Sequence, residues 1–209
     1  MSLVREAAGV SLATQHHFVI KRSWWSFLDR VFRVLTADGQ LIMYVKHPLL
    51  RLREEFVVYA DEAQTRPLLH IKSRQMIAIN FAFEIREAGS EQVLGSVEKR
   101  GLRSLVRDRF ILRDPAGQEI GYAEEQGASW LRRLFPFLTS KHAIIVGGAQ
   151  VAFLRQRFRF FIKEFAVDTD PGAVDPRFVL AVALLAVIAE VRREQGRSPL
   201  DAAADALGG

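Results

Sequence analysis

The sequence predicts an all-β, barrel-like domain that contains one buried helix. Three features indicate this: a degenerate repeat of about 26 residues, alternation of apolar and polar residues within each unit, and one apolar segment near the C-terminus that is too short to cross a membrane. At 209 residues the chain fits a single β domain. We expect a flexible N-terminus over 1–15, the domain over 16–196 and a frayed tail over 197–209.

Two independent markers define the repeat and drift together along the chain. Acidic residues lead the turns at intervals of 23, 26 and 27, at Asp38, Asp61, Glu87 and Asp114. Basic connectors begin at intervals of 25, 26 and 27, at Lys21, Lys46, Lys72 and Lys99. The Asp-Gly and Asp-Pro-x-Gly sequences in these turns provide the backbone angles that tight hairpin turns need. Each unit is therefore predicted to be a β-hairpin.

The runs between the markers have the period of two that is typical of strands. Phe81, Phe83 and Ile85 alternate with polar or small residues, and Phe110 and Leu112 alternate with arginines. Serial hairpins place successive turns at opposite ends of a sheet. The acidic turns should then gather at one rim and the basic connectors at the other. The basic rim would contain Lys21, Arg22, Lys46, Arg51, Arg53, Lys72, Arg74, Lys99, Arg100 and Arg103.

A long apolar-rich run from Val151 to Val167 predicts a strand with a bend near Arg155–Arg159, because seventeen residues is long for one strand. On a straight strand Arg155, Arg157 and Arg159 would share one face. These arginines are candidates for a basic stripe that contacts anionic headgroups. An ordinary solvated face is the alternative interpretation.

The segment Ser129–Thr139 interrupts the rhythm of the repeat. Its apolar residues have roughly helical spacing, and Pro136 would kink or end a helix there. One interpretation is a lid on the core. The other is a wedge that enters a membrane surface, with Trp130, Phe135 and Phe137 as the contacting residues.

Asp175-Pro176 suits the start of a helix, since Asp can cap it and Pro is preorganised at the first helical position. Twelve apolar residues follow, from Phe178 to Ala189, and Glu190 ends the run. At 1.5 Å per residue they span about 18 Å, against a hydrocarbon core of about 30 Å. A helix that is apolar on every side and too short for a bilayer belongs inside the protein. We predict a central helix over about 176–194.

Composition narrows the classes of function. The chain has no cysteine, which excludes disulfides and thiolate metal sites, and its formal charge is +5. Between Lys99 and Lys163 there are 13 basic and 5 acidic residues, a local net charge of +8. Such a charge favours anionic partners. The five histidines form no metal-binding pattern, and no nucleophile elbow or phosphate loop occurs. We therefore expect neither catalysis, nor a cofactor, nor a metal.

Four segments follow one another in a characteristic order: FVIKRSWWSFLDRVFRVLTADGQLIMYVKHP, FVVYADEAQTRPLLHIKS, FILRDPAGQEIGYAEE and the closing DPRFVLAVALLAVIAE. In this order of elements the chain resembles the LURP-one-related proteins, within the superfamily of Tubby C-terminal-like and phospholipid scramblase-like domains. The resemblance covers roughly Phe18 to Glu194. It implies a closed antiparallel barrel of about twelve strands around a central hydrophobic C-terminal helix.

The resemblance implies less about function. Tubby-like members bind phosphoinositides through a few Lys and Arg residues, and scramblase-like members carry an acidic, calcium-associated loop before their apolar helix. Here Asp168–Asp175 occupies that place. A twelve-residue calcium loop needs an acid at its last position, which in this chain is Val179. We therefore interpret the segment as a turn and a helix cap.

The leading hypothesis is a non-catalytic module that binds anionic phospholipid of phosphoinositide type at a membrane surface. The resemblance also implies that this module is related to phospholipid scramblases. The alternative is an interaction scaffold that binds acidic protein partners. Nucleic-acid binding ranks lower, because no binding signature is present. The N-terminus lacks the apolar core of a signal peptide, which favours a cytoplasmic protein. The lipid-binding hypothesis adds a peripheral association with a membrane. The candidate headgroup ligands are Arg155, Arg157, Arg159, Lys99, Arg100 and Arg103.

Overall fold

The computed structural model describes residues 6–7, 10–12, 14–23, 29–48, 55–77, 80–99, 109–126, 140–157, 162–170, 172 and 174–195. The strands in this part of the chain are β1 (Glu6–Ala7), β2 (Val10–Ser11), β3 (His17–Ser23), β4 (Asp29–Thr36), β5 (Leu41–Pro48), β6 (Glu55–Tyr59), β7 (Pro67–Ile77), β8 (Asn80–Glu87), β9 (Val93–Lys99), β10 (Arg109–Arg113), β11 (Glu119–Gln126), β12 (Lys141–Val146), β13 (Ala149–Arg157) and β14 (Ile162–Thr169). The described helix is α2 (Pro176–Gln195).

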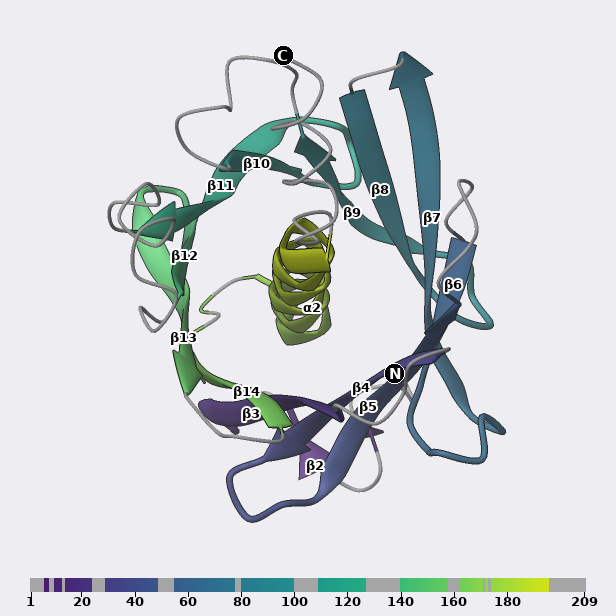
Figure 1. The fold of residues 1–209 in the computed structure, drawn as a ribbon. Helices are drawn as coiled ribbons and strands as arrows, with labels where there is room; N and C mark the ends of the chain where they lie inside the picture. Colours follow the sequence, from purple (N-terminus) through teal and green to yellow (C-terminus); the bar gives the residue numbers. More distant parts are fainter. Residues whose placement is uncertain are drawn as a thin grey trace, which may run out of the picture.

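Twelve of the described strands, β3 to β14, close into one antiparallel barrel around α2 (Figure 1). Strands that are consecutive in sequence are neighbours in the barrel, and the pairing of β14 with β3 joins its first and last strands. The short strands β1 and β2 pair with each other in a separate sheet. The predicted fold, a closed barrel of about twelve strands with one central helix, is confirmed.

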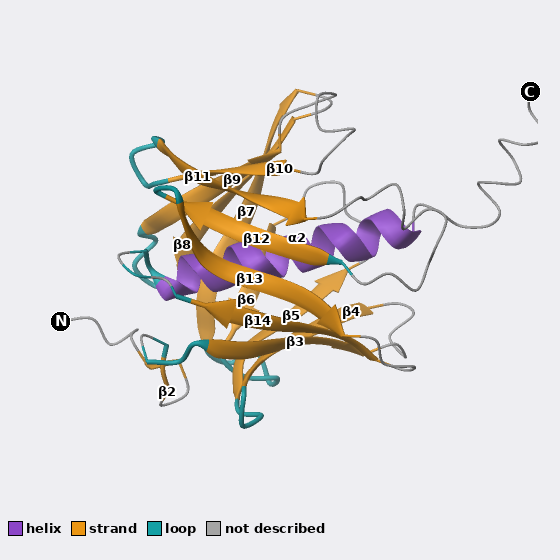
Figure 2. Cartoon of the chain, turned by 90° about the vertical axis from the view of Figure 1, so that its left-hand side faces the viewer, coloured by secondary structure: helices purple, strands orange, loops and turns teal. Residues whose placement is uncertain are grey.

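The hairpin turns lie at one end of the barrel, where α2 also begins, and the longer connectors leave from the other end (Figure 2). In the β4–β5 turn the N–H of Gly39 donates to Thr36 O at 3.0 Å, and Gly39 has a φ of 89°. We call the two ends the turn end and the connector end. The turns and connectors therefore separate as predicted from serial hairpins, although most connector residues lie outside the described residues.

The inner wall is apolar because alternate residues of each strand face the helix. In β3, for example, Phe18 and Ile20 are fully buried, whereas Val19 between them is only half-buried. The same alternation supplies one buried layer all round the barrel, including Phe32, Val34, Leu69, Ile71, Ile85, Leu112, Ile144, Leu154 and Phe165.

The helix fills this barrel. Every residue from Phe178 to Ile188 is at most 6% exposed, and all of them belong to the same core cluster as the strands. A helix that is apolar all round can bury the side chains of every face only when other elements surround it. At Gly95, an added Cβ would lie 2.5 Å from Phe178 Cε2, so the wall and the helix approach there as closely as a glycine permits. The predicted burial of this segment is confirmed.

The prediction of one bent strand over Val151–Val167 was wrong. This stretch forms two antiparallel strands, β13 and β14, in which Arg157 lies opposite Glu164. The physical reason is hydrogen bonding: each half of the run needs a partner on both sides, and folding back on itself supplies one. The common face of Arg155 and Arg157 was correctly anticipated, but the reversal between residues 157 and 162 was not.

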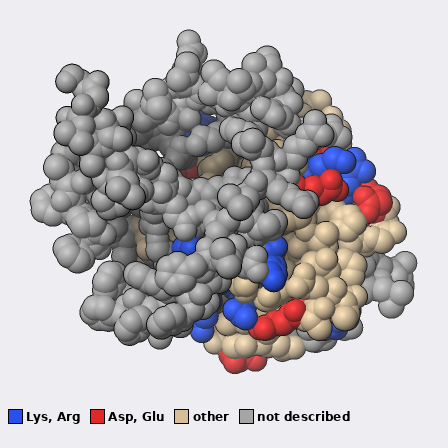
Figure 3. All heavy atoms as spheres, turned by 45° about the vertical axis from the view of Figure 1, so that its right-hand side comes forward, with Lys and Arg blue, Asp and Glu red and all other residues tan. Residues whose placement is uncertain are grey.

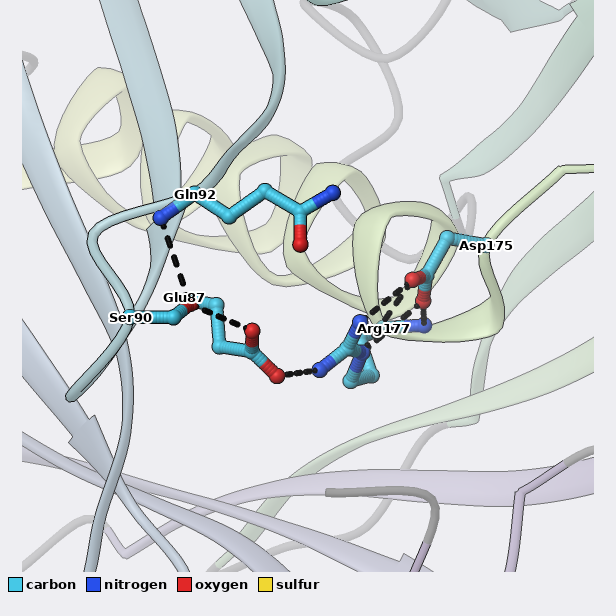
Figure 4. A network of polar contacts seen from close by, with 5 residues as sticks. All are labelled: Glu87, Ser90, Gln92, Asp175 and Arg177. Atoms are coloured by element: carbon cyan, nitrogen blue, oxygen red, sulfur yellow. Dashed lines mark hydrogen bonds and ion pairs between the residues drawn. The ribbon is translucent and has the colours of Figure 1, made fainter. Parts of the chain in front are cut away.

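A polar clamp fixes the N-terminus of α2 (Figure 4). The Asp175 carboxylate accepts hydrogen bonds from the Arg177 backbone N–H at 2.8 Å and from its guanidinium. The same guanidinium donates to Glu87, at the end of β8, and Ser90 also donates to that carboxylate. The segment before α2 is thus a turn that ends in a helix cap, as predicted.

The clamp should make the fold sensitive to acid. Burial raises the pKa of Asp175, but the hydrogen bonds from Arg177 outweigh it and leave the pKa below its ordinary value. The Ser90 hydroxyl and then Arg177 lower the pKa of Glu87 in spite of its burial. Groups with depressed folded-state pKa values stabilise the fold above about pH 4, and that stability is lost as the pH falls through the folded pKa.

We predict that Arg177→Leu lowers the free energy of unfolding by about 2–4 kcal/mol, since it leaves two partly or fully buried carboxylates without their cation. Urea denaturation at neutral pH measures this. In Glu87→Gln the loss of stability with acid should become shallower. Arg66→Leu is the matched control, because Arg66 pairs with Asp61 at an exposed turn and should contribute less than about 1 kcal/mol. Equal losses for Arg177→Leu and Arg66→Leu would contradict the clamp.

Candidate anion-binding surface

Arg155 and Arg157 lie on the outer face of β13. Leu154 of β13 is fully buried on the face toward the helix, whereas both arginines are exposed on the opposite face of the strand. As predicted, these two arginines therefore lie on the same face of the strand. Arg159, the third member of the predicted stripe, lies outside the described residues.

The strand register adds two lysines to these arginines. Lys141 of β12 lies directly opposite Arg155, and Arg157 is followed across the sheet by Glu164 of β14 and then by Lys21 of β3. Directly opposite residues have Cβ atoms about 5 Å apart. We call the outer surface formed by Lys21, Lys141, Arg155 and Arg157 the basic wall.

The charges of the basic wall are largely uncompensated. Its one carboxylate, Glu164, is only 4% exposed at the side chain and lies 3.4 Å from Arg157 Nη1. Within the described residues no carboxylate forms an ion pair with Lys21, Lys141 or Arg155. Four cations and one carboxylate leave a net charge of +3 on this surface.

Arginines elsewhere on the barrel are mostly paired. The distances to the partner carboxylate are 2.7 Å for Arg33–Glu62, 3.2 Å for Arg66–Asp61, 2.5 Å for Arg86–Glu84 and 3.1 Å for Arg113–Glu98. Figure 3 shows this mixture on the side of the barrel toward β6 and β7, where basic and acidic atoms lie next to each other. Arg66 lies beside Asp61 in the β6–β7 turn, so the turn end is not purely acidic. The basic wall differs from these pairs in carrying unpaired cations.

Lys99 is the one other predicted ligand that the structure describes, and it does not lie at the basic wall. Lys99 ends β9, and four strand steps separate β9 from β13, which is about 19 Å at the usual strand spacing. Arg100 and Arg103 follow it and lie outside the described residues. So do Trp130, Phe135 and Phe137, which belong to the connector between β11 and β12, immediately before Lys141.

Two members of the basic wall, Lys141 and Lys21, were not among the predicted headgroup ligands. Lys21 was expected at a basic rim, and the structure places it in the wall beside Glu164. Lys141 becomes part of the surface only through its pairing with Arg155. No group of three metal-ligating side chains occurs among the described residues. The chemistry that this surface offers is thus the binding of anions by fixed cations.

The architecture defines the class of protein: a Tubby-like closed β-barrel threaded by one hydrophobic helix. The model of the LURP-one-related family matches residues 16–187, so the chain belongs to that family. The match spans nearly the whole region in which the sequence resembled the family.

Among solved structures, an X-ray structure of a protein from Arabidopsis thaliana is similar in fold. It has a TM-score of 0.51 and 16% sequence identity, and the likeness covers 92% of this chain and 99% of that one. At this identity the likeness supports the fold alone. None of the curated proteins matches the sequence significantly. Among the described helical residues, no segment has the length and hydropathy needed to span a membrane.

Proposed function

We propose that the protein is a non-catalytic module that binds anionic phospholipid surfaces reversibly through the basic wall. The observation that carries this proposal is the set of three cations, Lys21, Lys141 and Arg155, without a carboxylate partner among the described residues. Family membership and the Tubby-like fold agree with a lipid-binding role of this kind.

The expected affinity is modest. Each surface Lys or Arg contributes about 1 kcal/mol at an anionic leaflet, so three unpaired cations supply on the order of 3 kcal/mol. Electrostatic attraction of this type is screened over about 8 Å at physiological salt. Binding by the wall should therefore be weak, salt-sensitive and readily reversed.

The proposal includes a second, apolar contribution from the β11–β12 connector. This segment leaves the connector end directly before Lys141 and contains Trp130, Phe135 and Phe137. Aromatic residues next to cations are suited to a membrane interface, where the rings enter the boundary region and the cations meet the headgroups. In this arrangement the connector end faces the bilayer and α2 remains inside the barrel.

Charge reversal tests the wall. We predict that Arg155→Glu and Lys141→Glu each weaken binding to phosphatidylserine-containing vesicles by at least about tenfold, and that added salt abolishes the difference. Co-sedimentation with vesicles of phosphatidylserine in phosphatidylcholine measures this. Arg157 is unsuitable for reversal, because a glutamate there would place a second carboxylate beside the buried Glu164.

The control for charge reversal is Lys72→Glu, which changes the net charge equally. Lys72 lies on β7, its side chain is 56% exposed, and Glu55 lies 3.8 Å away. Equal weakening of vesicle binding by Lys72→Glu and Arg155→Glu would show that only net charge matters, and would reject the basic wall as the binding surface. Binding to an acidic protein, with no binding to anionic vesicles, would reject the lipid proposal in favour of a scaffold.

A further inference from the structure

One arginine on the inner face of the barrel has no charge partner among the residues that the structure describes. Arg22 of β3 follows the outward-facing Lys21 and shares the inward face with the fully buried Ile20. Phe32 of β4, which lies directly opposite Arg22, is also fully buried. Because β3 ends one residue later, at the connector end, Arg22 lies at the edge of the apolar core (Figure 2).

The guanidinium of Arg22 is desolvated without compensation. Its Nε is shielded from solvent and has no hydrogen-bond acceptor among the described residues. Burial lowers the pKa of Arg22 below its ordinary value. Arg33 shows the contrast, because its hydrogen bond to Glu62 raises its pKa. A desolvated charge without a partner reduces the stability of a fold, and such groups are retained chiefly at functional sites.

Basic residues occupy two neighbouring positions in the same ladders. Lys163 of β14 lies directly opposite Arg22, and Arg30 of β4 lies diagonally opposite, two residues before Phe32. Directly opposite Cβ atoms are about 5 Å apart, and diagonal neighbours are about 7–8 Å apart. Among the described residues, none at an opposite or diagonal position to Arg22 is acidic. We call Arg22, Arg30 and Lys163 the inner basic cluster.

We propose that the inner basic cluster binds a phosphate-type dianion, with Arg22 as its central ligand. Like charges at directly opposite positions destabilise a sheet, and an oxyanion between them replaces this repulsion with attraction. The planar fork of a guanidinium matches the oxygens of a phosphate, and three cations suit a dianion better than a single carboxylate. Arg22 is partly exposed, so a solute that approaches the connector end can reach it.

This site is separate from the basic wall. Successive residues of a strand point to opposite faces, so Lys21 belongs to the outer surface and Arg22 to the inner one. The inference therefore does not depend on lipid binding by the wall. The phosphate comes either from a soluble ion or from a phosphomonoester at a membrane surface, and the experiment below distinguishes these two sources.

NMR of arginine side chains tests the site directly on the full chain. The Nε–H signal of Arg22 should shift with inorganic phosphate and saturate, because a bound oxyanion changes the environment of the whole guanidinium. The Nε–H signals of Arg33 and Arg66 are internal controls, since both groups already donate to carboxylates. Sodium chloride at the same ionic strength should leave the Arg22 signal in place.

One variant and a matched control isolate the arginine. Arg22→Met should weaken the binding of inorganic phosphate at least about tenfold, which is the loss expected for charge-assisted hydrogen bonds. Isothermal titration measures this. In phosphate-free buffer Arg22→Met should be at least as stable as the wild type, because it removes a desolvated cation. Arg66→Met is the control, since it removes an arginine that already pairs with Asp61, and it should leave phosphate binding unchanged.

Vesicles separate the two sources of phosphate. Phosphatidic acid presents a phosphomonoester, whereas phosphatidylserine does not. Weaker binding of Arg22→Met to phosphatidic acid vesicles would assign a lipid-borne ligand, and an effect on inorganic phosphate alone would assign a soluble one. Binding to phosphatidylserine vesicles should be unchanged in Arg22→Met, so failure of this proposal and failure of the basic wall are distinguishable.

The site is disproved if the Arg22 signal of the wild type does not respond to phosphate, or if chloride shifts it equally. It is also disproved if Arg22→Met and Arg66→Met bind phosphate equally well. Should Arg22→Met fail to fold, the wild-type titration with its internal controls decides the question.

Discussion

Replacing Leu184 with Asp should prevent the barrel from forming. Leu184 is fully buried in the middle of α2, so a carboxylate there has strand side chains on every side and no water. The cost of an unpaired buried charge is several kcal/mol, which is comparable with the total stability of about 5–15 kcal/mol of a typical domain. Circular dichroism and size-exclusion chromatography should show an unfolded or aggregated chain.

The milder substitution Leu184→Ala makes the same prediction measurable. It should lower the free energy of unfolding by about 3–4 kcal/mol, because the rigid wall cannot collapse onto the cavity that it leaves. Urea denaturation gives the value, and Val57→Ala, on the half-buried outer face of β6, is the control, with an expected cost of about 1 kcal/mol. A cost below about 0.5 kcal/mol for Leu184→Ala would mean that the helix does not occupy the barrel.

Gly121→Ala should also destabilise the protein severely, by at least about 3 kcal/mol. Gly121 lies in β11 opposite Val146, and an added Cβ would stand 1.9 Å from the backbone oxygen of Ile145. A backbone atom cannot move aside as a flexible side chain can, so the β11–β12 pairing must shift. Because Lys141 belongs to β12, the same shift would also disturb the basic wall.

Thermal and urea unfolding of Gly121→Ala measure this effect. Gly39→Ala is the control, since nothing lies within 4 Å of its added Cβ and only its φ of 89° is unfavourable. That strain costs about 1–2 kcal/mol. If Gly121→Ala were as stable as the wild type, the close β11–β12 register would be incorrect.

The parts of the fold that follow local rules could be predicted from sequence. Alternation in runs such as Phe81–Ile85, and acidic turns such as Asp114–Gly117, indicate hairpins wherever they occur. The length and uniform apolarity of Phe178–Ala189 leave a protein interior as its only environment. These signals need no information about distant residues.

The place of Lys141 in the basic wall could not be predicted, because a bulge sets the register of β12 against β13. Across the Gly147-Gly148 turn Val146 pairs with Ala149, and a regular continuation would put Lys141 opposite Leu154, on the other face. The register shifts between Ile144 and Ile145, and the shift brings Lys141 opposite Arg155 instead. A change of one residue reverses the face of every later side chain, and the sequence carries no marker for it.

The clamp at the start of α2 could not be foreseen either, since it joins residues that are far apart in the chain. Arg177 and Glu87 are 90 positions apart, and they meet only because the barrel closes around the helix. Such pairs depend on closure and on strand stagger rather than on any local pattern. Helix capping by Asp175 was predictable, but the link from Arg177 to Glu87 of β8 was not.

The most direct test of the account is to ask which end of the barrel meets an anionic membrane. The chain has no cysteine, so a single introduced cysteine can carry an environment-sensitive fluorophore without ambiguity. Gln126 and Glu119 are exposed at opposite ends of β11, Gln126 at the connector end beside Lys141 and Glu119 at the turn end. With phosphatidylserine vesicles, we expect a label at Gln126 to brighten and shift to the blue while a label at Glu119 stays unchanged. A response at Glu119, or equal responses at both positions, would contradict membrane binding through the basic wall.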